Sequence, residues 1–142
     1  MTTNRKDIRS AIKSALTGHV PSAQVLYGYL PHTFNHESPV VCLSSSGTNR
    51  IKLTQQGYAP LLFVNIHIFV SYGSATDDSW TEEQAEDALD TVEMEVADAL
   101  LAASTSNLKF IWVDRSFADE PVEDSGETYL HEIIPISVKA VT

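Results

Sequence analysis

The sequence predicts an α+β fold, a two-layer sandwich in which a mainly antiparallel sheet of about five strands carries two helices packed on one face. Two segments have apolar residues at helical spacing, and the segments between them alternate in polarity or are rich in β-forming residues. With 142 residues, 43% of them hydrophobic, the chain can bury one sizeable core. We therefore expect residues 1–142 to form a single domain.

The first helix is expected over residues 4–17. Ile8, Ile12 and Leu16 recur at helical spacing, and Gly18 follows where a glycine commonly ends a helix. The other face of this helix carries four basic residues: Arg5, Lys6, Arg9 and Lys13. Such a face is a solvated surface, a docking surface for an acidic neighbour, or a contact with DNA or membrane.

Two short strands are expected next, over residues 25–29 and 39–43, because both segments are rich in β-forming residues. Residues 44–49, with the sequence Ser-Ser-Ser-Gly-Thr-Asn, have the composition of a turn-forming loop. They lack the Gly-Lys-Ser/Thr that opens a helix in a phosphate-binding loop. The sequence therefore argues against nucleotide binding at this loop.

Residues 61–72 alternate in polarity and predict the central strand. One set of side chains is apolar throughout and is expected to face the core: Leu62, Val64, Ile66, Ile68, Val70 and Tyr72. The other set mixes aromatic and polar groups, as on a half-exposed sheet face: Phe63, Asn65, His67, Phe69 and Ser71. Nothing nearby in the sequence completes a site with His67, so we expect a satisfied histidine at a surface or interface.

The second helix is long and acidic, and Ser79 and Glu82 have the spacing of a capping box at its start. The residues expected to face the sheet are mostly small: Ala85, Ala88, Leu89, Val92, Val96, Ala99 and Ala103. Met94 and Leu101 fall on the opposite side. They lie among three carboxylates: Asp87, Asp90 and Asp98. Apolar residues in this setting indicate an oligomer or partner contact, or ordinary scattered exposure.

Two further strands are expected over residues 109–114 and 129–141. The core side of the last strand is assigned to Leu130, Ile134, Ile136 and Val138. Residues 119–126 are acidic and show no apolar periodicity. We expect them to form a mobile loop.

Charge is divided unevenly along the chain. Residues 1–52 hold six basic and two acidic side chains, whereas residues 53–142 hold three and seventeen, giving a net charge of −10. No lysine or arginine lies between Lys52 and Lys109. This polarity favours contacts between copies of the chain, basic face to acidic face, and disfavours a wrapping contact of the acidic part with nucleic acid.

The cellular setting is expected to be a reducing one. Cys42 is alone, so no internal disulfide forms, and its apolar neighbours indicate a core position. No apolar run reaches the roughly 18 residues of a membrane helix, and no signal-peptide core follows the polar start. We expect a protein made in the cytosol that does not enter a membrane.

The sequence gives little support for a catalytic site. His131-Glu132 has no second histidine at the spacing of a zinc protease, and no serine lies in Gly-x-Ser-x-Gly. A metal site of His32, His36 and Glu37 is a minor candidate. The expectation is a protein that is not an enzyme, with no catalytic residue, no cofactor and no metal.

Several positions along nearly the whole chain carry a resemblance to a known family. They are Arg9, Ile12 and Leu16, Pro39-Val40-Val41, Arg50, the strand at 63–70, the run Ala85-Glu86-Asp87-Ala88-Leu89-Asp90, Trp112, and Gly126-x-x-Tyr129-x-x-Glu132-Ile133-Ile134. In order, length and these positions the chain resembles the tail-terminator and head-to-tail joining (neck) proteins of long-tailed bacteriophages.

This resemblance implies a structural virion protein, assembled in the host bacterial cytoplasm, that forms a hexameric ring at the head-tail junction. The ring would cap the tail-tube protein and join it to the head-connector protein, with DNA passing through the lumen without specific binding. Residues 44–58 and 117–126 would become ordered on meeting a neighbouring ring. Candidate interface residues are Arg5, Arg9, Lys13, Arg50, Lys52, Asp87, Asp90, Met94, Asp98 and Leu101.

Two alternatives remain open at this point. Another neck or tail-tube protein of the same virion would share the ring and its charge pattern. A cellular α+β adaptor or ligand-binding module would instead be a monomer or dimer with a defined pocket.

Overall fold

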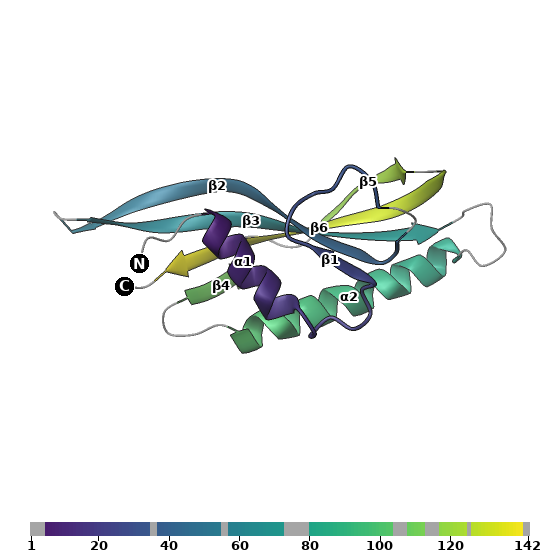
Figure 1. The fold of residues 1–142 in the computed structure, drawn as a ribbon, viewed down its shortest axis with the longest axis horizontal. Coiled ribbons are helices and arrows are strands. Elements are labelled where there is room, and N and C mark those ends of the chain that lie inside the picture. The colour runs from purple at the N-terminus through teal and green to yellow at the C-terminus, as the bar shows by residue number, and fades with distance from the viewer. Residues whose placement is uncertain are drawn as a thin grey trace.

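The computed structural model describes residues 5–34, 37–54, 57–72, 80–103, 108–112, 117–124 and 126–140. Two helices and six strands follow one another along the chain (Figure 1). In order they are α1 (Arg5–Leu16), β1 (Val25–Tyr27), β2 (Val40–Thr54), β3 (Gly57–Tyr72), α2 (Glu82–Ala103), β4 (Leu108–Trp112), β5 (Phe117–Asp124) and β6 (Glu127–Ala140).

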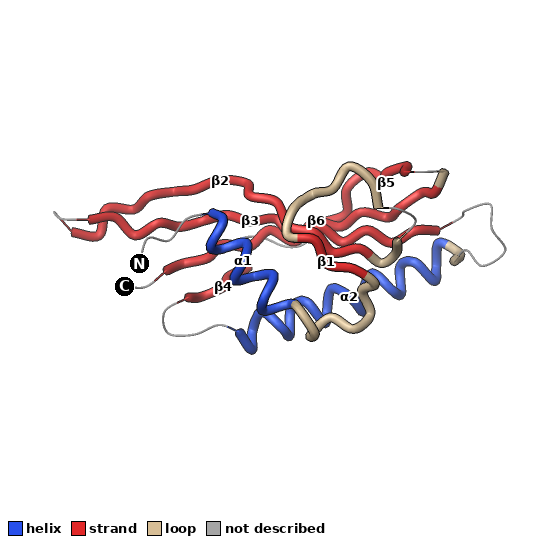
Figure 2. Tube along the Cα trace, viewed as in Figure 1, coloured by secondary structure: helices blue, strands red, loops and turns tan. Residues whose placement is uncertain are grey.

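The strands form one six-stranded sheet in the order β1-β2-β3-β6-β4, with β5 also paired to β6. β1 runs parallel to β2, and the other pairs are antiparallel. Both helices pack on the same face of the sheet (Figure 2). The predicted α+β class and mainly antiparallel sheet are therefore confirmed, with six strands in place of about five.

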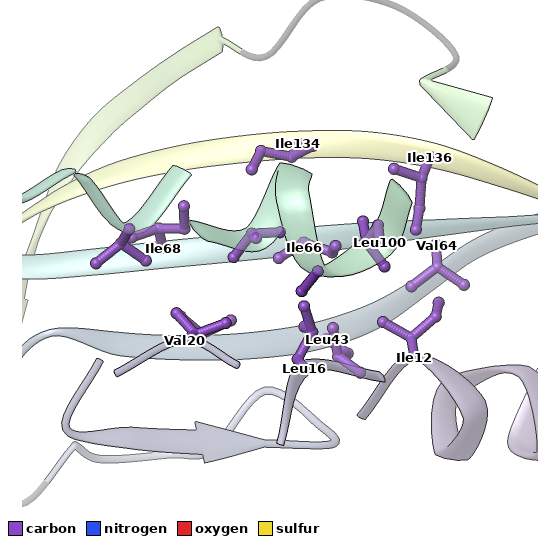
Figure 3. Packing of buried hydrophobic residues seen from close by; sticks show 14 of the residues in the cluster. Ile12, Leu16, Val20, Leu43, Val64, Ile66, Ile68, Leu100, Ile134 and Ile136 are labelled. Atoms are coloured by element: carbon purple, nitrogen blue, oxygen red, sulfur yellow. The ribbon is translucent and has the colours of Figure 1, made fainter. Parts of the chain in front are cut away.

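The core lies between the helices and this face of the sheet. The alternation predicted for β3 is confirmed, because Leu62, Val64, Ile66, Ile68 and Val70 are all buried and Tyr72 packs against them. Ile12 and Leu16 of α1 meet Leu43 of β2 and the β3 side chains in this layer (Figure 3). On α2 the buried stripe also includes Leu100, which the expected set of small residues omitted.

The N-terminus of α2 is closed by a capping box two residues further along the chain than expected. The Thr81 backbone N–H donates to Gln84 Oε1 at 2.9 Å, and the Gln84 N–H donates to Thr81 Oγ1 at 3.2 Å. Each side chain therefore satisfies a backbone donor that the helix leaves free. The predicted box at Ser79 and Glu82 is wrong, since α2 begins at Glu82; Ser79 itself lies outside the described residues.

The turn-forming loop expected over residues 44–49 is strand in the structure. β2 continues to Thr54 and pairs with β3 as far as Gly57. The expectation from composition is wrong because cross-strand hydrogen bonds override local turn preference, and a register shift between Ser45 and Gly47 takes up Ser46 as the extra residue of a β-bulge. The resulting hairpin projects beyond both helices at one end of the molecule (Figure 1).

The mobile acidic loop expected over residues 119–126 is also wrong. Residues 117–124 form β5, which pairs with β6 through a tight turn at Gly126, whose φ is +82°. The pairing uses backbone groups, which apolar periodicity does not report. Its register shifts between Asp119 and Val122, where Pro121 has no N–H to donate.

The sheet face away from the helices is more buried than its mixed composition indicated. A second apolar cluster there contains Phe34, Val40, Cys42, Phe69 and Tyr129. The Phe34 ring lies 4.6 Å from that of Phe69 and 4.9 Å from that of Tyr129. The segment after β1 thus covers one end of this face, and the expected core position of Cys42 is confirmed.

Candidate functional site

On each side of the sheet two strands lack an outer neighbour in the described part of the chain: β1 and the projecting part of β2 on one side, and β4 and β5 on the other. β1 pairs only with Val40–Cys42, so the outer side of β2 is open from Leu43 to Thr54. On the far side β4 pairs with β6 alone, and its outer side is open as well. Unpaired edges of this kind offer backbone donors and acceptors to another strand.

The open stretch of β2 and the strand β4 lie at the same level of the sheet. Aligned pairs cross it from β4 through β6 and β3 to β2: Trp112, Ile136, Val64 and Ser45 in one row, and Lys109, Lys139, Leu61 and Asn49 in another. Because β2, β3, β6 and β4 are successive antiparallel neighbours, the two edges run in opposite directions. The edge of β4 in one copy therefore fits that of β2 in a second copy of the same orientation, as a further antiparallel pair.

The helices divide between the two sides of the sheet. α1 lies over β2 and β3, whereas α2 lies over β3 and β6. Of the basic residues on α1, Lys6 and Lys13 are exposed, and the partly buried Arg9 donates a 2.6 Å hydrogen bond from Nη1 to Ser45 Oγ. The basic helix thus sits on the β2 side of the sheet and the acidic helix on the β6 side.

A shallow hollow of about 290 Å³ opens beside α1. Its lining is Lys6, Arg9, Ser10, Lys13, Gly28 and Tyr29. The Tyr29 ring is 62% exposed and follows β1, at the edge of the sheet. In a chain of net charge −10, this is a concentrated basic surface.

The exposure predicted for α2 is confirmed. Met94 is 64% exposed and Leu101 78% exposed. The carboxylates expected around them are exposed too: Asp87, Asp90 and Asp98. Their part in a subunit contact stays a prediction.

Three predicted interface residues are placed by backbone only. Arg5 opens α1, and Arg50 and Lys52 lie on the projecting part of β2; the side chains of all three are outside the described residues. The structure groups Arg5 with Arg9 and Lys13 on α1. It sets Arg50 and Lys52 apart, on the hairpin.

A chain of polar side chains that sequence reasoning missed crosses the helix-free face. Ser44 Oγ lies 2.7 Å from His67 Nε2, and His67 Nδ1 lies 2.9 Å from His131 Nε2. His131 Nδ1 lies 3.5 Å from Asp119 Oδ2. An ionised carboxylate only accepts, so His131 Nδ1 carries a proton, His67 Nδ1 donates to His131, and Ser44 donates to His67. This row of four side chains links β2, β3, β6 and β5.

Both histidines are held neutral. Burial, together with the charge of a neighbouring protonated His131, lowers the pKa of His67 from 6.5 to about 4, while Asp119 acts in the opposite direction. Burial also lowers the pKa of His131, partly opposed by Asp119. The expectation of a satisfied histidine at position 67 is confirmed, since both ring nitrogens have partners. The expected surface position is wrong, because His67 is 7% exposed and stacks in a row with Phe69 and His131.

Chemically, this row of side chains, from a carboxylate through imidazole to a hydroxyl, has the order of groups that polarises a serine hydroxyl. Ser44 lies within a paired strand, opposite Asn65 of β3, and its hydroxyl donates to His67. The arrangement is therefore suited to fixing β5 and the sheet in register. The one feature of the sequence that could have predicted this row is the alternation of side chains along each strand. It places His67 and His131 on the sheet face opposite the core side chains.

The minor metal candidate is not assembled in the described residues. Glu37 accepts a hydrogen bond from the Tyr27 hydroxyl, and His36 lies outside the described residues. Across the ranges that the structure describes, no group of three or more His, Cys, Asp or Glu side chains fits a metal ion.

No protein-family model matches the sequence, and no curated protein matches it. In the described part of the chain, neither helix combines the length and hydropathy of a membrane span.

Proposed function

We propose that this protein is a structural virion component of the tail-terminator type, which closes head to tail into a ring at the junction of a phage tail with its head. The observation that carries the proposal is the pair of open strand edges at one level of the sheet. An interface that joins β4 of one copy to β2 of the next needs no axial shift between copies. Such a heterologous contact closes into a ring when the rotation per copy divides a full turn.

The position of the helices supports the same contact. Joining these edges brings α2 of one copy beside α1 of the next, because α2 lies on the β6 side and α1 on the β2 side. The acidic helix then faces the basic helix. Two independent features, strand edges and helix charge, favour one arrangement.

The proposed ring also accounts for the acidity of the chain. Asp119, Glu120 and Glu123 are exposed on β5, the strand that Asp119 ties to the helix-free face of the sheet. If that face lines the lumen, its carboxylates repel phosphates and DNA slides through without binding. The expected partners are the tail-tube and head-connector rings above and below.

The test is the mass in solution by light scattering after size exclusion, at low salt and near 1 M salt, followed by electron microscopy of the particles. We expect a species of about six times 15.6 kDa that dissociates with salt, because the contact is partly electrostatic. Images should show a ring with one sheet continuing across each subunit boundary. A species that remains monomeric at every concentration and salt would contradict the proposal.

A ligand-binding module is the second candidate, and one pocket favours it. This pocket lies on the helix-free face, beside Phe34, Phe69, Val122, Asp124 and His131, and its volume is about 220 Å³. Small-molecule sites commonly occupy about 300–1,000 Å³. The pocket is therefore small for that role, and the ring is the better supported proposal. Another neck or tail-tube protein would make the same ring at a different position in the particle.

A further inference from the structure

The basic hollow beside α1 stands out in an acidic protein. Lys6 and Lys13 are exposed at its rim, with Arg9 between them. Its floor is open because Gly28 has no side chain: a Cβ there would lie 3.3 Å from Lys13 Cδ. Tyr29 adds an exposed aromatic surface on the side of the sheet edge.

An acidic flank of α2 has the complementary chemistry. The Glu95 carboxylate faces the segment after α1, where it accepts hydrogen bonds of 2.9 and 2.7 Å from the Ser22 N–H and hydroxyl. Glu86 is nine residues earlier, which is half a turn round the helix at about 3.6 residues per turn. Glu86 and the exposed Asp90 therefore lie on the flank of α2 that faces away from its own α1.

We propose that the basic hollow of one copy receives the acidic flank of α2, centred on Glu86 and Asp90, from a second copy of the chain. This inference rests on the proposed ring and names the side chains of its helical layer. The hollow borders the β1–β2 edge of the sheet, and the flank lies on the β6–β4 side. Copies joined edge to edge bring these two surfaces together.

The contact also needs apolar area, because exposed ion pairs are individually weak. Tyr29 on the basic side and Leu101 on the acidic side supply it. Leu101 lies on the outward side of α2, eleven residues after Asp90, or about three turns along the helix. The combination explains why large apolar residues remain exposed on a helix that already has a buried stripe.

The test uses two charge-reversal variants of the full chain. The basic-face variant is Lys6→Glu with Lys13→Glu, and the acidic-face variant is Glu86→Lys with Asp90→Lys. In each variant the hollow and the flank carry charge of the same sign, so each alone is expected to fall from the ring mass to the monomer mass. Their mixture is expected to regain the ring with the two variants alternating, because every contact then joins an acidic surface of one variant to a basic surface of the other. The fourfold variant with both changes is expected to regain the ring.

A control matched to the acidic-face variant changes the charge by the same amount and in the same direction elsewhere. Glu120→Lys with Glu123→Lys alters two exposed carboxylates on β5 and should leave the ring mass unchanged. Rings that form normally from either face variant would overturn the docking surface and leave the ring proposal standing. A fourfold variant that is folded by circular dichroism yet monomeric would also overturn it.

Two further outcomes separate the docking surface from the ring. If the wild-type chain is monomeric, a cross-linker between Lys13→Cys and Asp90→Cys chains decides the question: linked dimers support the surface, and their absence overturns it. Cys42 is buried and does not compete for the reagent. If duplex DNA binds the wild-type chain and not the basic-face variant, the hollow is a phosphate site and the proposal is wrong.

Discussion

His67 Nδ1 lies 2.9 Å from His131 Nε2, and the two rings stack with centroids 5.1 Å apart. The residues are 64 positions apart in sequence and sit on neighbouring strands β3 and β6. Only one ring can donate across this distance, and because His67 Nδ1 is the donor, His131 Nε2 must stay unprotonated. Protonating His131 at Nε2 would place two donors face to face, whereas a proton added to His67 goes to Nε2, on the side of Ser44.

The histidine pair predicts that stability falls in mild acid. The pKa of His67 is about 4 in the folded protein and 6.5 as a reference for the unfolded chain, so the unfolded state binds more protons between these values. The stabilisation is complete above pH 6.5 and is lost as the pH falls from 6.5 to 4. We expect the free energy of unfolding in urea to be lower at pH 5 than at pH 7 by about 2 kcal/mol from His67 alone. The lowered pKa of His131 acts in the same direction.

Two histidine variants isolate this effect. His67→Gln should reduce the pH dependence between pH 7 and pH 5, whereas His19→Gln, at an exposed position, should keep it. Equal pH dependence in the wild type and in His67→Gln would show that the pair is not its source.

Cys42 is predicted to be unreactive in the folded protein. Its side chain is fully buried in the second apolar cluster, and burial raises the pKa of the thiol from 9.0 to about 12. Because the thiolate is the reacting form, a thiol reagent at pH 8 should label Cys42 only when denaturant is added. Ser10→Cys on the exposed face of α1 provides the control and should react at once. Rapid labelling of Cys42 without denaturant would show that this cluster opens readily.

The capping box at the start of α2 predicts a difference between two identical substitutions. Thr81→Ala removes the acceptor of the Gln84 N–H and should lower the free energy of unfolding by about 1 kcal/mol. Thr91→Ala, on the exposed side of the same helix, loses only a bond to the Asp87 carbonyl and gains helix propensity. Urea unfolding of both variants should rank Thr81→Ala as the less stable. The reverse order would mean that the box contributes little.

The parts of the fold that sequence predicted are those with a strong period. β3 alternates from Leu62 to Tyr72, and α2 repeats small apolar residues at helical spacing, so burial on one side determines both. β5 escaped prediction because Val122 is its one large apolar residue between Phe117 and Asp124, and its pairing is made by backbone groups. The continuation of β2 past Leu43 escaped for the same reason, since a partner strand, and not local composition, decides it.

Some features of the candidate surfaces could be predicted from the sequence, and others could not. Helical spacing was enough to place Met94 and Leu101 on the exposed side of α2 and to separate basic from acidic helices. The open strand edges required the register of four strands, and the contact of Ser44 with His67 required strands that are distant in sequence. Neither feature can be recognised from residues that are close together in the sequence.

If α2 carries a subunit contact, Ile134→Ala should weaken the stability of the single chain, whereas Leu101→Ala should weaken assembly. Ile134 is fully buried in the core, so Ile134→Ala should lower the free energy of unfolding of the single chain by about 2–5 kcal/mol. Leu101 is 78% exposed, so Leu101→Ala should change the stability of the free chain by less than about 0.5 kcal/mol. In the ring, however, the Leu101 side chain is removed from water, and its loss should raise the concentration needed for assembly. Thermal unfolding of dilute protein and light scattering over a concentration series measure the two effects separately. A Leu101→Ala variant that assembles at the wild-type concentration would leave this exposed leucine without a role in the contact.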